Sequence, residues 1–282
     1  ERKFVGERYF MGSGSGVIGF EVTSEEPVRL VESGPVGGVV GAAAYAKALN
    51  RAGMDLGEAF GRIILGVSVD GEYFINIAKL CTSPYLLGVT QSLPVNSVNE
   101  LVARAKARPT ELNYGSSGNG SALHVATELF RSSAGIKITH VPYKSVPASE
   151  MDLIGGQIQM MIGNFATMAT HVQSGKIRAL AITSPKRSPL LPNVPTMAEA
   201  GIPAAELTTW IGVMAPAKLP PAIAKKIHEE FTAAVKDPKV IKQLADIGCD
   251  VDPTTMENFD RLVQSENARW GAVVRQNNIT AD

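Results

Sequence analysis

A loop of glycines and small polar residues lies at residues 113–124, where the sequence reads NYGSSGNGSALH. Glycines leave backbone N–H groups accessible, serines add hydroxyls, and the helix expected to follow has the positive end of its dipole here. Such a set of donors suits an anion. The loop residues that we expect to contact a ligand are Ser116, Ser117, Gly118, Asn119, Gly120 and Ser121. A turn in which the glycines only satisfy the backbone geometry explains the same spacing.

The residues that this loop lacks narrow the kind of anion. A phosphate-binding P-loop requires lysine after its second glycine, but Gly120 is followed by Ser121 and Ala122. A dinucleotide-binding motif requires glycine where the chain has Leu123, and a nucleophile elbow requires glycine where it has Asn119. What is left is a nest of uncharged donors, which favours reversible binding of a carboxylate over phosphoryl or acyl transfer.

Other polar residues fall where strands are expected to end. In an open parallel sheet, ligands bind in the crevice outside the carboxyl ends of the strands. We therefore expect one polar cleft lined also by Tyr143, Asn164, Thr183 and Ser184. Trp210 either lines the ligand site or fills the hinge between two lobes.

No catalytic group is evident. His124, one turn into the expected helix, fits a core or capping histidine better than a base, because no partner carboxylate lies at useful spacing. Glu128 and Asp152 fall within helical patterns and are interpreted as parts of solvated faces, which leaves no acid–base pair. The four histidines show no metal-binding spacing. We expect neither a metal nor a cofactor.

The composition excludes some partners. The 282 residues carry a formal net charge of zero, which argues against nucleic acid or an anionic membrane as the main partner. No run of about 18 apolar residues occurs, and the first residues lack the apolar core of a secretory signal. Cys81 and Cys249, far apart in sequence, are interpreted as buried small hydrophobes rather than as a disulfide.

The elements that must position these residues follow a regular order. From about residue 74, short β-branched runs alternate with helical patterns, which predicts parallel strands, crossover helices and an α/β fold. Ser97 and Glu100 have the spacing of a capping box, and Gly135 is expected to close the helix after the loop. Two extended passages, 184–203 and 208–221, are expected to carry the chain between two lobes.

Four stretches share the pattern of one family: LPVNSVNELVARAKARPTELNYGSSGNGSALHVATELFRSSAGIKITHVPYKS, DLIGGQIQMMIGN, GKIRALAITSPKRSPLLPNVPTMAEAG and WIGVMAPAKLPP. With them, the chain from about residue 74 onward resembles the Bug-type substrate-binding receptors of tripartite tricarboxylate transporters. The resemblance implies a type II periplasmic-binding-protein (Venus-flytrap) fold, in which two α/β lobes close on a small carboxylate and deliver it to a membrane permease. It implies a non-catalytic periplasmic receptor with ligand contacts at 116–121, followed by His124, at Tyr143 and Lys144, and at Asn164. Because such a carrier must dock on a permease, we expect a monomer. Position 163 is glycine where the family commonly has aspartate, which weakens any side-chain contact there.

The first residues fit this pattern less well. The stretch 8–44, RYFMGSGSGVIGFEVTSEEPVRLVESGPVGGVVGAAA, looks like a fragment of the hydantoinase A and acetone carboxylase group. An ATP-dependent enzyme fragment of that type is the alternative function.

We expect residues 1–55 to be an atypical segment, in which Gly37 and Gly38 stand where the receptors have a glycine loop of the carboxylate clamp. The expected division then groups 56–108 with 218–282 in the first lobe and assigns 109–217 to the second. If 1–55 comes from an unrelated coding piece, the first lobe lacks part of its sheet.

Overall fold

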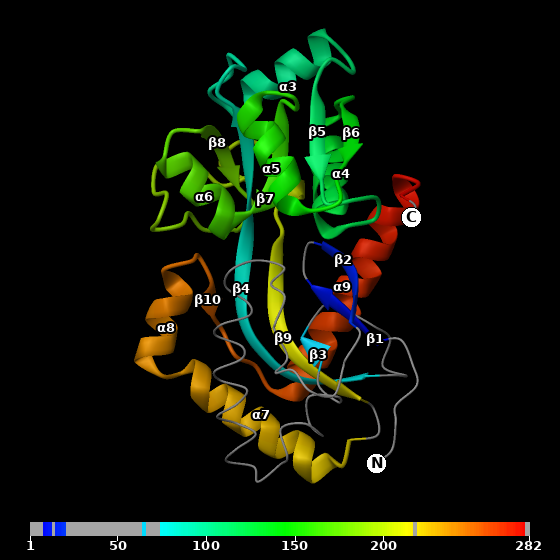
Figure 1. Ribbon diagram of the computed structural model, residues 1–282, viewed down its shortest axis with the longest axis vertical. Coiled ribbons are helices and arrows are strands. Elements are labelled where there is room, and N and C mark those ends of the chain that lie inside the picture. Colours follow the sequence, from blue (N-terminus) through cyan, green and yellow to red (C-terminus); the bar gives the residue numbers. More distant parts are fainter. Residues whose placement is uncertain (1–7, 13–14, 21–63, 66–73, 217–218, 280–282) are drawn as a thin grey trace.

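The structure is a computed structural model that describes residues 8–12, 15–20, 64–65, 74–216 and 219–279 (Figure 1). The predicted ligand residues Gly37 and Gly38 lie outside the described residues. Of the first part of the chain, the structure describes an antiparallel pair of strands, β1 (Arg8–Gly12) and β2 (Ser15–Phe20), and the short strand β3 (Ile64–Leu65).

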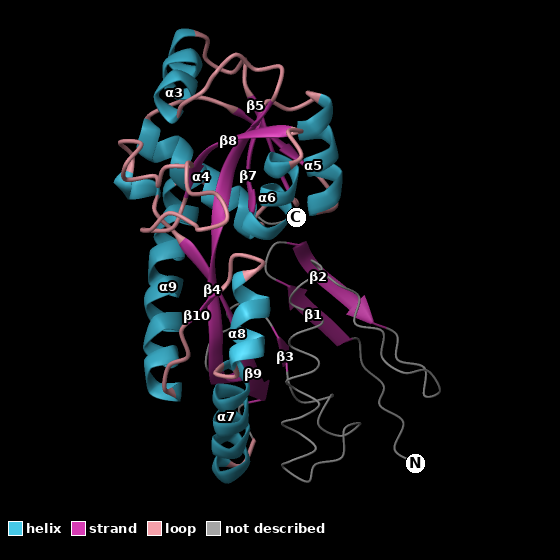
Figure 2. Ribbon diagram, turned by 90° about the vertical axis from the view of Figure 1, so that its left-hand side faces the viewer, coloured by secondary structure: helices cyan, strands magenta, loops and turns pink. Residues whose placement is uncertain are grey.

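One long strand, β4 (Phe74–Thr90), runs through both lobes of the molecule (Figures 1 and 2). Its first part, up to Pro84, pairs with β9 (Thr208–Pro216), whereas Tyr85 and the residues after it pair with β7 (Met160–Asn164) and β8 (Ile177–Ile182). Proline has no N–H to donate to a ladder and is tolerated where pairing is interrupted. Pro84 therefore stands where the strand exchanges one set of partners for another.

The upper lobe in Figure 1 is built from strand and helix units. Strand β5 (Asn113–Ser116) pairs in parallel with β6 (Thr139–Pro142) and with β7. The helices of this lobe are α3 (Val98–Ala107), α4 (Ala122–Ala134), α5 (Val146–Gly155) and α6 (Phe165–Gln173), with the short 3₁₀ helix η1 (Pro203–Ala205). The predicted alternation of strands and helices is thus confirmed, with antiparallel β4 inserted between β7 and β8.

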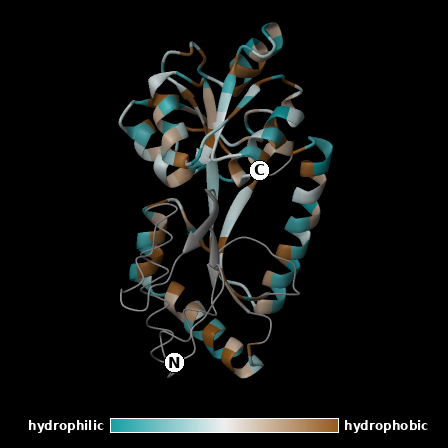
Figure 3. Ribbon diagram, turned by 45° about the vertical axis from the view of Figure 1, so that its right-hand side comes forward, coloured by the Kyte–Doolittle hydropathy of each residue, from teal (hydrophilic) through white to brown (hydrophobic). Residues whose placement is uncertain are grey.

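The lower lobe packs helices against the other half of β4. It contains α7 (Pro221–Val235), α8 (Pro238–Ala245), β10 (Asp250–Val251), which pairs with β4, and the first part of α9 (Met256–Gln276). The helices mix apolar and polar residues along their length, as amphipathic helices on a core do (Figure 3). Helix α9 then continues up to the other lobe, where Trp270 packs against its core.

The start of α3 and the end of α4 lie where the sequence predicted them. The Ser97 hydroxyl accepts a hydrogen bond from Glu100 N at 3.2 Å, and Glu100 in turn accepts from Asn96 N at 2.7 Å. The predicted capping box is therefore present, with its return bond one residue earlier than in the usual motif. Gly135 closes α4 with φ of 61°, the left-handed conformation that favours glycine.

Each lobe has its own hydrophobic core. The upper core contains residues of β4 after Pro84, together with Val98, Leu101 and Ala105 of α3. The predicted division, which groups 56–108 with 218–282, is therefore wrong for α3. The lower core joins Ile77, Ala78 and Leu80 of β4 to β9 and α7.

The connections between the lobes also differ in part from the prediction. The proline-rich passage 184–203 remains in the upper lobe, where it contributes Leu191, Met197 and Ile202 to the core. The passage 208–221 does carry the chain across, and its extended residues 208–216 form the regular strand β9. The strand begins with the half-buried Thr208 and Thr209 and is mostly buried beyond them, where it pairs with β4.

Replacing Leu101 by alanine tests the assignment of α3 to the upper core. Leu101 is fully buried, so Leu101→Ala is expected to lower the free energy of unfolding by about 2–5 kcal/mol. Urea denaturation followed by circular dichroism measures this change. The neighbouring half-buried Val102 is the matched control, and an equal loss in Val102→Ala and Leu101→Ala would contradict the packing.

Candidate ligand-binding site

The strand register brings several predicted site residues to one edge of the upper sheet. Tyr114 of β5 lies opposite Met160 of β7, and the two parallel strands end at the same edge of the sheet, β5 at Ser116 and β7 at Asn164. Asn164 is paired with Tyr85 of β4. The carboxyl ends of β5, β6, β7 and β8 all reach this edge, which faces the lower lobe (Figure 1). This is the convergence of loops that the sequence predicted.

The conformation of the loop at 116–121 depends on its glycines and on hydrogen bonds within the loop. Gly118 and Gly120 have φ of 119° and 71°, which side chains rarely permit. Gly118 N donates to the Ser116 hydroxyl at 3.2 Å, Gly120 N to His124 Nδ1 at 3.1 Å, and Ser121 N to the Gly118 carbonyl at 3.3 Å. The expectation that these three amides are accessible donors is therefore wrong in this conformation.

Two of the loop serines are structural. Ser116 is fully buried, and its hydroxyl lies 2.6 Å from His140 Nε2 and 3.0 Å from the Gly118 carbonyl. The Ser121 hydroxyl caps α4 by accepting from His124 N at 3.3 Å. Ser117, also buried, and the half-buried Asn119 lie between these two anchors.

Three stacked rings lie next to the loop, and two of them, His124 and His140, make hydrogen bonds with it. The rings of His124 and His140 are 3.8 Å apart between centroids and nearly parallel, and the ring of Tyr114 stacks on His140 at 4.8 Å. The structure agrees with the interpretation of His124 as a core histidine, since it is buried and its Nδ1 accepts from the loop. The acceptor role requires the neutral imidazole with its proton on Nε2.

A buried carboxylate holds the stack in place. The Tyr114 hydroxyl donates to Glu128 at 2.7 Å, and Arg131 pairs with the same carboxylate at 2.6 Å. Burial, followed by the bond to Glu128, raises the pKa of Tyr114. The interpretation of Glu128 as part of a solvated face is wrong, because the ion pair allows the carboxylate to be buried. Arg131 also donates to Asn277 at the end of α9.

Tyr143 and Asn164 lie beside the loop. Tyr143 N donates to the Ser116 carbonyl at 3.0 Å, and the Tyr143 hydroxyl donates to Asp152 at 2.8 Å. Burial and this bond raise the pKa of Tyr143 to about 12, so the hydroxyl stays protonated. Asn164 is the N-cap residue of α6, but its half-buried side chain makes no capping hydrogen bond. Its amide is therefore not committed to the helix.

Three other predicted residues have structural contacts instead. Thr183 is fully buried, and its hydroxyl accepts from Tyr85 N at 2.8 Å and lies 3.2 Å from the Tyr85 carbonyl. The Ser184 hydroxyl donates to the Lys186 carbonyl within a turn. Trp210 packs edge-to-face on Phe259 of α9, which favours the filling of the hinge over contact with a ligand.

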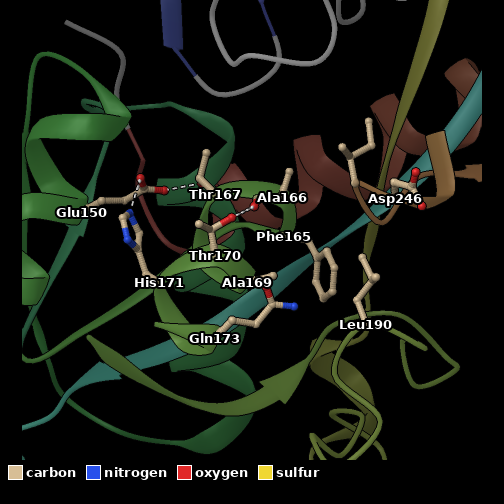
Figure 4. Close-up of a pocket in the computed structure, with 11 residues that line it drawn as sticks. Glu150, Phe165, Ala166, Thr167, Ala169, Thr170, His171, Gln173, Leu190 and Asp246 are labelled. Atoms are coloured by element: carbon tan, nitrogen blue, oxygen red, sulfur yellow. Dashed lines mark hydrogen bonds and ion pairs between the residues drawn. The ribbon is translucent and has the colours of Figure 1, made fainter. Parts of the chain in front are cut away.

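A separate crevice of about 460 Å³ opens between the lobes next to α6 (Figure 4). Its walls are Phe165 and other residues of α6, together with Glu150, Leu190 and, from the lower lobe, Asp246 and Ile247. Burial raises the pKa of Glu150, which accepts from Thr167 and lies 3.6 Å from His171 Nε2. None of the predicted ligand residues that the structure describes lines this crevice. Sequence spacing did not indicate it, because its walls come from segments nearly 100 residues apart.

Within the part of the chain that the structure describes, no three potential metal ligands cluster, and no helix is long and apolar enough to span a membrane.

The fold and the edge of polar loops define a class of protein. Two α/β lobes that share long strands, with uncharged donors at the edge facing the gap between lobes, are typical of solute-binding proteins. The profile of the tripartite tricarboxylate transporter family receptor matches residues 70–279, and the chain belongs to this family of receptors, which are not enzymes.

Individual relatives agree with this assignment. The protein BugT of Bordetella pertussis is 31% identical over 89% of this chain and 79% of its own length. The UPF0065 protein in the tcbD-tcbE intergenic region of a Pseudomonas species is 30% identical over 74% of this chain, but the match spans only 62% of that relative. A solved structure of Rpa4515 from R. palustris with adipate is 29% identical, with a TM-score of 0.75 over 86% of this chain and 94% of that one.

The beginning of the chain has a second similarity. Residues 1–109 match the hydantoinase/oxoprolinase family, which agrees with the expected resemblance of residues 8–44. The match overlaps the receptor profile at 70–109 and falls mostly outside the described residues.

Acidification is expected to weaken the support of the loop through His124. Burial lowers the pKa of His124, an effect that Arg131 reinforces and Glu128 opposes. Between this lowered pKa and the ordinary value of about 6.5, the unfolded chain binds more protons, so the free energy of unfolding falls as the pH drops through this range. His124→Asn retains an acceptor for Gly120 N without a titrating group. Urea denaturation between pH 5 and 8 should show a smaller acid-dependent loss in the variant, and parallel profiles would contradict the role of His124.

Proposed function

We propose that this protein is a periplasmic receptor that binds a small carboxylate between its lobes and delivers it to the membrane permease of a tripartite transporter. The observation that carries the proposal is the position of the loop at 116–121, which opens α4 at the edge of the upper lobe that faces the lower one. Membership of the receptor family supports it, as does the relative solved with adipate.

The proposed ligand contacts are a revised subset of the predicted ones. Ser117 and Asn119 from the loop, together with Asn164 at the start of α6, supply uncharged donors near two helix N-termini. Ser116, Ser121, His124 and Tyr143 then hold the loop rather than the ligand. A hydrogen bond to a charged group contributes roughly 1.5–3 kcal/mol, so a few such donors bind a carboxylate firmly once water is excluded.

The absence of a cation from residues 113–124 suits a carrier. Lysine or arginine in direct contact would add affinity but would also slow release, which sets the lifetime of a complex. Closure would occur as a hinge motion where β4 exchanges partners at Pro84 and Tyr85. The bound acid leaves chemically unchanged, and no cofactor takes part.

A ligand screen tests the proposal. The folded protein is heated with a panel of dicarboxylates including adipate, tricarboxylates, aromatic acids and acidic amino acids, and the midpoint of unfolding is followed by fluorescence. A ligand at 100 times its Kd adds about 2.7 kcal/mol to the free energy of unfolding, which raises Tm by roughly 5–10 °C. If no acid on the panel raises Tm in a folded sample, the receptor function is not supported.

Substitutions in the loop locate the site. Ser117→Ala and Asn119→Ala should each weaken binding of the best acid roughly 10-fold or more, because each removes a hydrogen bond to a charged group. Isothermal titration calorimetry measures the affinities, and circular dichroism checks the fold. Ser133→Ala, at an exposed position of the same helix α4, is the matched control. Unchanged affinity in both loop variants would place the site elsewhere.

A further inference from the structure

The lower lobe contains a pair of cysteines that the proposed function does not use. Cys81 lies in β4 and Cys249 precedes β10, 168 positions further along the chain. Their sulfur atoms are in contact at 2.8 Å, and both residues are buried. They are the two cysteines of the chain, so neither has another partner within it.

The backbone around the pair is held in register. Val251 of β10 is paired with Cys81 and Asp250 with Thr82, and Lys79 forms an ion pair with Asp252. Cys249 N donates to the Leu244 carbonyl at the end of α8, which fixes the other side of the contact. Strand pairing and the end of α8 therefore hold the two thiols in contact, which is the placement that an intramolecular bond requires.

We propose that Cys81 and Cys249 form an intramolecular disulfide, which fastens the turn at 246–249 to the shared strand β4. The proposal rests on the periplasmic location proposed above, because disulfides form and persist in oxidising compartments. It replaces the interpretation of the two cysteines as independent buried hydrophobes. Both sulfurs are shielded from solvent, which excludes a bridge between two copies of the folded chain.

The bond requires an external oxidant, which is a small-molecule or protein disulfide. In the first step, one cysteine loses its proton and its sulfur attacks the oxidant disulfide, which forms a mixed disulfide and releases one thiolate of the oxidant. In the second step, the other cysteine, also deprotonated, attacks the mixed disulfide and releases the second thiolate of the oxidant. Two protons and two electrons thus leave the cysteine pair, and the oxidant becomes two thiols. The contact with Cys249 and burial raise the pKa of Cys81, so the pair reacts slowly once folded and is expected to oxidise during folding.

The bond has a consequence for the gap between the lobes. Gly248, next to Cys249, packs so closely on Phe165 of α6 that a Cβ there would lie 2.2 Å from Cδ1 of the ring. Phe165 directly follows Asn164, and Asp246 and Ile247 line the crevice of Figure 4. The disulfide therefore fixes the lower-lobe surface that touches the upper lobe beside the proposed ligand site.

Thiol counting tests the proposal. The chain is refolded from urea in a mixture of reduced and oxidised glutathione, and its free thiols are then alkylated in denaturant. Mass spectrometry measures the mass of the intact protein and of its proteolytic peptides. We expect no alkyl group on the refolded chain, a linked peptide containing Cys81 and Cys249, and two alkyl groups after dithiothreitol. Because the bond closes a long loop, the oxidised protein should melt roughly 5 °C or more above the reduced one.

Variants provide the control. Cys81→Ala, Cys249→Ala and the double variant should all lose the difference in Tm between oxidising and reducing buffer, and each single variant should carry one alkyl group. A wild-type chain that regains native circular dichroism but takes up two alkyl groups overturns the proposal. If refolding fails, the same count on protein produced in a bacterial periplasm decides between these outcomes. No carboxylate is needed, so failure here leaves the receptor function intact, and failure of the ligand screen leaves the disulfide intact.

Discussion

The organisation of this protein depends on one strand that belongs to two lobes. Along β4, the partners change from β9 to β7 and β8 at Pro84 and Tyr85. Each lobe then builds its own core on one half of the strand. Because backbone hydrogen bonds continue through the exchange, the lobes stay in register while their side-chain cores remain separate. At this point the Thr183 hydroxyl accepts a hydrogen bond from the Tyr85 N–H and donates one to the Tyr85 carbonyl.

The ligand loop shows how uncharged groups are made ready for a charged ligand. Three of its amides are satisfied internally by Ser116, His124 and the Gly118 carbonyl, which fixes the loop before any ligand arrives. A preorganised loop loses less conformational entropy on binding than a mobile one. The cost is that fewer amides remain for the ligand, so recognition is left to side chains and to the N-termini of α4 and α6.

The sequence predicted the features that depend on local spacing. The alternation of strands and helices, the cap at Ser97, the closure at Gly135 and the convergence of strand ends all follow from short patterns. Features that depend on contacts between distant segments were missed. Glu128 looks solvated in sequence because its partners Tyr114 and Arg131 surround it only in the fold. Thr183 looks like a ligand residue until the pairing of β8 with β4 brings its hydroxyl to Tyr85.

The last helix reaches further into the site than its position in the chain indicates. The side chain of Asn277, just past the end of α9, accepts a hydrogen bond from Arg131. Arg131 forms an ion pair with Glu128, and Glu128 accepts a hydrogen bond from Tyr114, whose ring stacks on His140 next to the loop. Helix α9 begins in the lower lobe, so any rotation of one lobe against the other must either carry this hydrogen bond along or break it. The C-terminal end of α9 is therefore linked, through Arg131 and Glu128, to the residues that support the ligand loop.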